Sequence, residues 1–120
     1  MSSKQSLWII IAGVTGFLGV AIGAFGAHGL EGRLSEKMLA TFHTGVLYHL
    51  IHAVVLLALA LNYSEKFSLT LVFILTGIIL FSFSLYIYSV TGLKFFAMIT
   101  PLGGLSFLIG WGLIAFKAFR

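Results

Sequence analysis

The sequence predicts an all-α integral membrane protein, a four-helix bundle with short loops. Only ten of the 120 side chains are charged, seven basic and three acidic, while 60% of the residues are hydrophobic. None of the ten lies in residues 7–30, 38–64, 67–93 or 95–116, and each of these blocks can cross a hydrocarbon core of about 30 Å as a helix. The blocks are continuous apolar runs, which favours helices over the alternating strands of a barrel. We therefore expect one transmembrane domain over residues 1–120, with helices at about 7–30, 36–62, 67–90 and 100–117.

The first helix is rich in glycine at spacings of three and four residues. Small residues let a neighbouring backbone approach closely, which matters in lipid because no hydrophobic force drives helices together there. We expect this helix to be central in the packing, and a glycine-lined solute path is the alternative. Its apolar run exceeds the 7–15 residues of a signal-peptide core, so we expect a retained span. The glycines predicted to pack, here and in later helices, are Gly16, Gly19, Gly23, Gly26, Gly45, Gly103 and Gly110.

The second helix has a clear predicted start at Ser35, whose hydroxyl can cap free backbone amides. Glu36 follows at the positive helix end, and Leu34 is placed to pack on Leu39. Residues 62–66 form a short polar connection. The second and third helices should therefore be antiparallel neighbours.

The third helix carries several Ser and Thr residues, which can bond the preceding turn of their own helix and do not by themselves indicate a pore. Residues 91–94 are typical of a helix stop. We expect Thr100 to cap the fourth helix, with Pro101 at its first position, where the missing amide costs nothing.

Four crossings place both termini and the second loop on one side of the membrane. That side carries Lys4, Lys66, Lys117 and Arg120, and the other side carries three Lys or Arg residues. The positive-inside rule then favours cytoplasmic termini by a small margin and leaves dual topology open. The net charge of +4 is scattered, without a basic stripe, so it suits anionic lipid headgroups better than nucleic acid.

The most specific local pattern is a polar stripe on the second helix. Gly45, Tyr48, His49 and His52 follow one another at i, i+3, i+4 and i+7, which places them on one face with the two imidazoles about 4.5 Å apart in rise. Ionisable groups inside a membrane span are candidates for a functional site by default. Residues at the ends of the first and third helices should converge on the same membrane face. The candidate ligand or proton pathway, opening between the first and third loops, is His28, Tyr48, His49, His52, Tyr86 and Ser89.

Three interpretations of this stripe stay open. Neutral histidines and tyrosines can hydrogen-bond across helices and fix their register, or they can line a pathway for a ligand, an ion or a proton. His49 and His52 can also share a metal or a haem, although no carboxylate or cysteine lies near enough in sequence to complete a zinc site. We therefore expect no cofactor, with metal or haem at this pair as the minor option. Catalysis has no support, because the chain lacks HExxH, a P-loop and a Ser-His-Asp arrangement at one depth.

Several motifs together are similar to a known family. They are GAFGAHGL at 23–30, TGVLYHLIHA at 44–53, Ser84-Leu85-Tyr86 before Thr91-Gly92, and TPLGG at 100–104 followed by Gly110-Trp111. Over nearly its whole length the chain resembles the YwdK/YgdD family of small bacterial membrane proteins. The resemblance implies a four-helix integral membrane protein without an established activity, a domain of unknown function. It supplies no catalytic or binding residue.

The sequence therefore favours a non-enzymatic protein of the cell (inner) membrane that crosses it several times. Its expected partners are the lipid bilayer and either further copies of itself or another membrane protein, with no nucleic acid. The first alternative is a small transporter or channel with a His/Tyr-lined pocket at the face of the first and third loops. The second is a membrane protein that binds a metal or haem.

Overall fold

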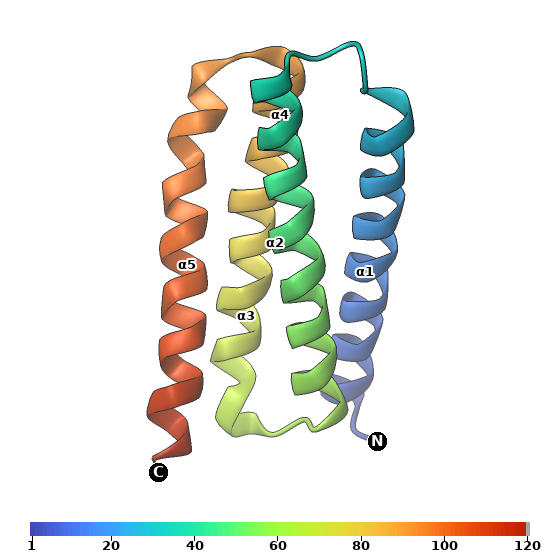
Figure 1. Cartoon of the computed structure of the whole chain (residues 1–120). Coiled ribbons are helices and arrows are strands. Elements are labelled where there is room, and N and C mark those ends of the chain that lie inside the picture. The colour runs from blue at the N-terminus through green and yellow to red at the C-terminus, as the bar shows by residue number, and fades with distance from the viewer. Residues whose placement is uncertain (120) are drawn as a thin grey trace.

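The structure, a computed structural model, describes residues 1–119 as four antiparallel helical spans (Figure 1). Each span is long and apolar enough to cross a membrane. The predicted fold class is therefore confirmed: the described chain is an all-helical membrane bundle. Its elements are α1 (Ser3–Gly29), α2 (Glu36–Leu61), a third span made of η1 (Glu65–Phe67), α3 (Ser68–Gly77), η2 (Ile78–Phe83) and α4 (Ser84–Thr91), and α5 (Lys94–Ala118).

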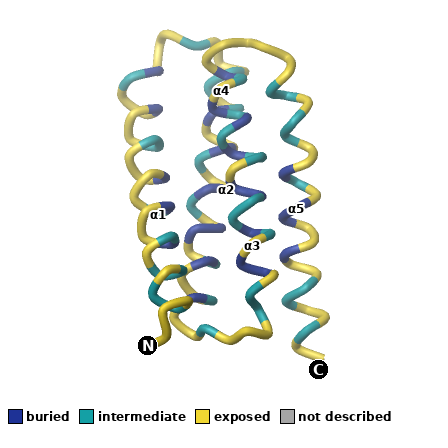
Figure 2. Tube along the Cα trace, turned by 180° about the vertical axis from the view of Figure 1, so that it is seen from behind, coloured by how far each residue is buried: buried dark blue, intermediate teal, exposed yellow. Residues whose placement is uncertain are grey.

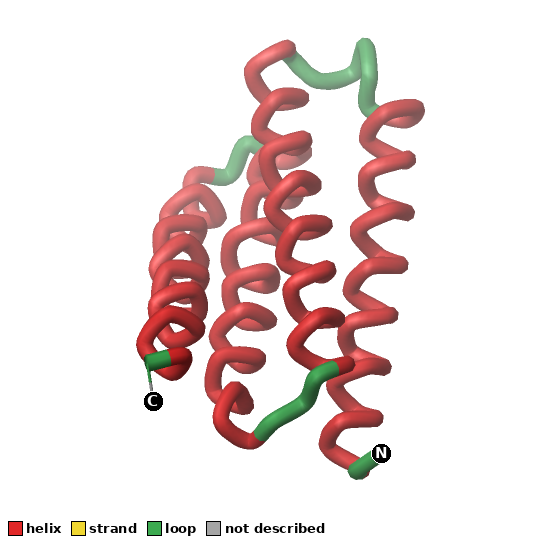
Figure 3. The backbone as a smooth tube through the Cα atoms, turned by 60° about the horizontal axis from the view of Figure 1, so that its bottom comes forward, coloured by secondary structure: helices red, strands yellow, loops and turns green. Residues whose placement is uncertain are grey.

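The spans stand in the order α1, α2, third span, α5, so that α1 and α5 form opposite edges (Figures 1 and 3). Helix α1 packs chiefly on α2, and α5 packs on the third span. Figure 2 shows more buried positions on the two inner spans than on the two edge spans, which are exposed along their outer sides. Only 17% of the apolar window of α1 is buried, against 44% for the third span. The prediction of a central first helix is therefore wrong, because α1 has a packing partner on one side only.

The glycines of α1 divide between two faces. Gly19, Gly23 and Gly26 lie against α2, and a side chain added at Gly19 would come within 2.7 Å of Leu50. Gly16 was predicted to pack with them, but no atom of another helix lies within 4 Å of the position that its Cβ would occupy. Gly16 is half-buried and lines a groove beside α2, but no side chain of that helix packs directly against it.

Side-chain caps set the starts of the first two spans. Ser35 Oγ accepts a hydrogen bond from the Met38 amide at 3.1 Å, which begins α2 at the predicted place. Ser2 Oγ accepts from the Gln5 amide at 3.1 Å, so α1 begins at Ser3 rather than near residue 7. A hydroxyl in the β region before the helix satisfies one of the free amides of the first turn in both cases.

The last span corrects the prediction for Thr100 and Pro101, which lie inside α5 and do not start it. Gly92, at φ 72°, ends α4, and α5 begins at Lys94. Pro101 lacks an amide hydrogen, so the carbonyl of Ala97 four residues earlier loses its helical donor. The Thr100 hydroxyl bonds the carbonyl of Phe96 at 3.2 Å and the hydroxyl of Ser84 at 2.6 Å.

The third span contains a π-helical segment, η2, where one ordinary helix was expected. At this segment the backbones of η2 and α5 touch, because a Cβ on Gly103 would overlap the Phe81 amide nitrogen and lie 2.6 Å from its Cα. Ser82, also in η2, is completely buried and donates to the carbonyl of Gly45 in α2 at 2.8 Å. The π segment thus lies where the third span contacts both of its neighbours. Such segments are frequent at functional sites of helices.

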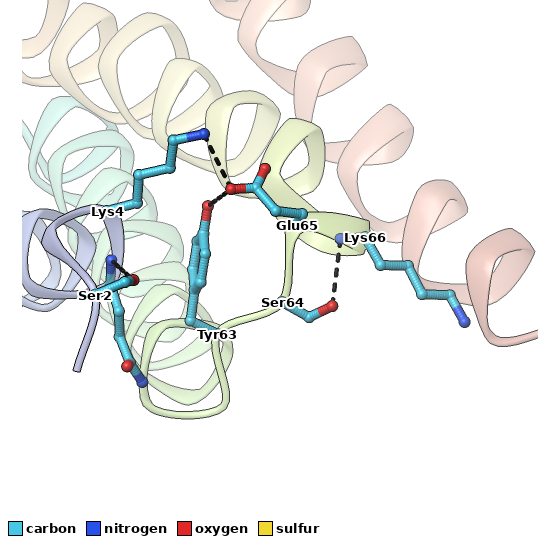
Figure 4. A network of polar contacts seen from close by, with 7 residues as sticks. Ser2, Lys4, Tyr63, Ser64, Glu65 and Lys66 are labelled. Atoms are coloured by element: carbon cyan, nitrogen blue, oxygen red, sulfur yellow. Dashed lines mark hydrogen bonds and ion pairs between the residues drawn. The ribbon is translucent and has the colours of Figure 1, made fainter.

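At the end of the bundle where both termini lie, polar contacts join the N-terminus to the loop after α2 (Figure 4). Lys4 Nζ and the Tyr63 hydroxyl both donate to the same oxygen of Glu65, at 3.0 and 3.1 Å. Lys117 Nζ donates to the Lys66 carbonyl at 2.7 Å, which joins the end of α5 to the start of the third span. Arg120, counted above among the basic residues of this end, lies outside the described residues.

Candidate functional site

His49 lies completely buried at the centre of the contact between α1, α2 and α4. Its Nε2 is 2.8 Å from the backbone carbonyl of Thr15 in α1, and its Nδ1 is 2.8 Å from the Tyr86 hydroxyl in α4. A carbonyl can only accept, so Nε2 carries the proton and Nδ1 accepts from the phenol. One neutral imidazole therefore holds three spans together.

His52 faces the opposite edge of the bundle and contacts α5. Trp111 donates its indole N–H to His52 Nε2 at 3.0 Å, and His52 Nδ1 lies 2.7 Å from the carbonyl of Tyr48 one turn earlier. An indole can only donate, so here Nδ1 carries the proton. The ring of Phe107 stacks on the imidazole with centroids 3.8 Å apart and planes 15° apart. His52 is thus a second neutral imidazole, in the other tautomer.

The two histidines do not share a ligand position. His49 is directed to α1 and α4, whereas His52 is directed to α5. The one lone pair left on each neutral ring already accepts a hydrogen bond, from Tyr86 in one case and Trp111 in the other. Within residues 1–119 no group of three or more His, Cys, Asp or Glu side chains is placed to hold a metal. The residues present therefore do not fit the metal or haem interpretation of His49 and His52.

Ser89 and Tyr86, the candidates from α4, are both buried. Ser89 donates to the Tyr86 carbonyl at 2.9 Å within its own helix, as Ser and Thr commonly do. Tyr86 reaches His49 through its hydroxyl, and its ring packs 5.1 Å from that of Phe42. Ser89 is therefore an intrahelical residue here, and Tyr86 is the one that bridges spans.

His28 does not join the cluster. It lies exposed at the end of α1, in the last turn before the loop. A groove of about 400 Å³ does exist at this end of the bundle, but apart from Tyr86 and Thr91 its walls are apolar. The other lining residues are Ile22, Phe25, Phe42, Phe83, Ile87 and Val90. The groove at this end of the bundle is therefore mostly apolar, and Tyr86 is the predicted pathway residue that lines it.

Sequence reasoning missed the partners of the two histidines. The Thr15 carbonyl is reachable because the residue one turn later is Gly19, where a Cβ would lie 3.3 Å from His49 Nε2. Gly19, four residues after Thr15, was therefore the feature of the sequence that could have indicated an accessible backbone carbonyl at Thr15. Trp111 was visible only as part of the Gly110-Trp111 motif, and its bond to His52 depends on how α5 packs.

These features define a class: a small helical membrane protein with two buried histidines that are hydrogen-bonded across its spans. A family profile described as "Protein of unknown function (DUF423)" matches residues 22–104. The chain belongs to this family, as the motifs of its sequence predicted.

Full-length relatives agree with this assignment. The UPF0382 membrane protein YwdK of Bacillus subtilis (strain 168) is 42% identical over 97% of this chain and 98% of its own length. A UPF0382 membrane protein of Haemophilus influenzae is 40% identical, with 97% and 96% covered. The UPF0382 inner membrane protein YgdD of Escherichia coli (strain K12) is 38% identical, with 93% and 88% covered. No solved structure matches the chain.

Proposed function

We propose that this chain is a non-catalytic protein of the cell's inner membrane that acts by lateral assembly, primarily with further copies of itself. The observation that carries the proposal is the bonding of His49 and His52, because every ring nitrogen of these two intramembrane groups is engaged inside the chain. Both imidazoles are thus engaged in joining one span to another. Buried polar networks of this kind fix how helices pack.

The open edge of α1 supports assembly. Gly13 and Gly16 have no atom of another helix within 4 Å of their Cβ positions. They line a groove of about 320 Å³, together with Phe17 of α1 and Ala53 and Val54 of α2. Small residues on a lipid-facing helix allow close backbone contact with another span. A second copy would place a helix in this groove.

The remaining chemistry of the chain favours a non-catalytic role. Its three carboxylates, Glu31, Glu36 and Glu65, lie at the ends of the spans, and Glu65 is paired with Lys4. The name of the Escherichia coli relative, an inner membrane protein, supports the same location for this chain. We place the termini in the cytoplasm, on the side with more Lys and Arg.

Assembly is tested by energy transfer between donor- and acceptor-labelled copies in liposomes, measured across a range of protein-to-lipid ratios. Transfer should exceed that expected for random proximity and should fall to that level when Gly13 and Gly16 are both replaced by Leu. Gly112→Leu is the matched control, since Gly112 is equally open but lies on α5. Transfer at the random level for the wild type would refute assembly of like copies. Proton or ion flux above that of empty liposomes would contradict a role in assembly alone and favour the transporter or channel alternative.

A further inference from the structure

A groove on the α5 edge of the bundle reaches the middle of the membrane. Tyr48 and His52 of α2, Phe81 of η2, and Gly104 and Trp111 of α5 contribute to its lining. Its volume is about 500 Å³, within the range of about 300–1,000 Å³ that is typical of small-molecule sites. Tyr48 lies about 18 Å along α2 from Glu36 and so near the midpoint of that span. The groove therefore opens sideways to the hydrocarbon phase and not to water.

Flat rings form the walls of this groove and are held in place. The rings of Tyr48 and Phe81 lie 4.6 Å apart, and those of Phe81 and Phe107 lie 5.6 Å apart. Phe107 stacks in turn on His52, whose orientation is fixed by the Trp111 indole and the Tyr48 carbonyl. Rigid aromatic faces favour a flat ligand, because offset stacking gains more than contact with a flexible chain.

Gly104 lines the groove without a side chain, and we call this position the floor of the groove. A Cβ added at Gly104 would have a single neighbour within 4 Å, the Phe81 ring at 3.9 Å. Gly103 beside it is in contact with the η2 backbone, so the surroundings of the two adjacent glycines differ. Gly103 brings the helices together, whereas Gly104 leaves space.

Tyr48, which lines the groove, has a hydroxyl that makes no hydrogen bond within the described residues. Across residues 1–119 no hydrogen bond joins the Tyr48 hydroxyl to another group, and Tyr48 is 39% exposed. Hydrocarbon tails offer neither donor nor acceptor, and a hydroxyl without a partner in such surroundings is costly. An occupant that carries an oxygen would remove this cost, whereas an acyl chain would not.

We propose that this groove binds a lipid-soluble molecule with a flat ring and a ring carbonyl, the chemistry of a quinone head group. The ring would lie against Phe81 and over Gly104, and the Tyr48 hydroxyl would donate to the carbonyl oxygen. The site is on the opposite edge of the bundle from Gly13 and Gly16, so it does not depend on the proposed assembly.

The test is fluorescence quenching by decylubiquinone in lipid nanodiscs. Trp8→Phe leaves Trp111 as the only tryptophan of the chain, and quinones quench indole fluorescence on contact. Quenching should saturate in this background. Gly104→Leu, which fills the floor, should raise the half-saturating concentration at least tenfold, and Tyr48→Phe should raise it several-fold. Gly112→Leu, open on the same helix but outside the groove, should leave it unchanged.

Each other outcome overturns the proposal. Quenching that rises linearly without saturation, or is equal in Gly104→Leu and Gly112→Leu, would mean that the quinone only partitions into lipid. Loss of energy transfer between copies in Gly104→Leu, with quenching unchanged, would make the groove a contact between copies. Gly104→Ala is the folding control, since its methyl group has room, and it should keep the wild-type circular dichroism spectrum and near-wild-type quenching.

Discussion

The bond between His49 and Tyr86 gives the sharpest test of how this bundle is held together. Tyr86→Phe removes only the hydroxyl, leaving the buried ring in its contacts with Phe42 and Phe83. The Nδ1 atom of His49, 2.8 Å away, then has no donor in a site with no exposed surface. Hydrogen bonds between membrane helices contribute about 0.6 kcal/mol on average and up to about 1.7 kcal/mol, and a buried group left unpaired costs about 1–3 kcal/mol.

We therefore expect Tyr86→Phe to lower the free energy of unfolding by about 1–3 kcal/mol. His49→Leu leaves both the phenol and the Thr15 carbonyl without their partner, so the expected loss is larger, about 2–4 kcal/mol. If the bond is made, the double variant should lose less than the sum, with a coupling of about 1 kcal/mol. The matched control is Tyr88→Phe on the same helix, expected to change stability by less than about 0.5 kcal/mol.

The measurement is reversible unfolding by sodium dodecyl sulfate in mixed micelles, followed by far-ultraviolet circular dichroism. Wild type, the two single variants, the double variant and Tyr88→Phe are compared under one set of conditions. Additive losses, or a Tyr86→Phe variant as stable as Tyr88→Phe, would refute the reasoning, since either would mean that the phenol and the imidazole are not coupled.

Three further outcomes are expected. Gly103→Ala should destabilise the protein by about 2 kcal/mol or more in the same unfolding assay, because the new methyl group would overlap the η2 backbone. Gly112→Ala, at a position with open space, should be neutral or slightly stabilising. Lys4→Ala should lower the unfolding midpoint only slightly, and raising the salt concentration should abolish the difference from wild type, because the Lys4–Glu65 pair is largely exposed. Exhaustive treatment with a metal chelator should leave the unfolding midpoint unchanged, and a drop would contradict the hydrogen-bond assignments of both histidines.

The sequence was sufficient to predict the four spans, because lipid leaves a chain so poor in charge few alternatives to helices. It also identified His49 and His52 as buried polar residues of the second span. The single face that their spacing predicted is divided, because His49 is directed to α1 and α4 and His52 to α5. The start of the last span was missed because Thr100 and Pro101 match a helix start by local rules. In a membrane bundle a proline inside a helix is tolerated, because Ser and Thr side chains and neighbouring helices satisfy the backbone groups that it frees. Here the Ser84 hydroxyl of α4 bonds the Thr100 hydroxyl.

Other features depend on contacts distant in sequence. The π segment lies where Gly103 of α5 touches its backbone and where Ser82 reaches the carbonyl of Gly45, and no pattern within residues 78–83 indicates either contact. The acceptor for His49 is the backbone carbonyl of Thr15, which every residue type possesses. Side-chain patterns can therefore identify the histidines but not the atoms that satisfy them.

The positions in the sequence of the donors to His49 and His52 also imply an order of events during synthesis. His49 bonds Thr15 inside the first helical hairpin, but Tyr86 follows it by 37 residues in the chain, and Trp111 follows His52 by 59. At about 5–20 residues per second, translation leaves these nitrogens without their donors for roughly 2–12 seconds. During that interval the newly inserted hairpin carries two unmet acceptors on opposite sides. The second hairpin carries both donors, so both acceptors are satisfied only once it has docked on the first.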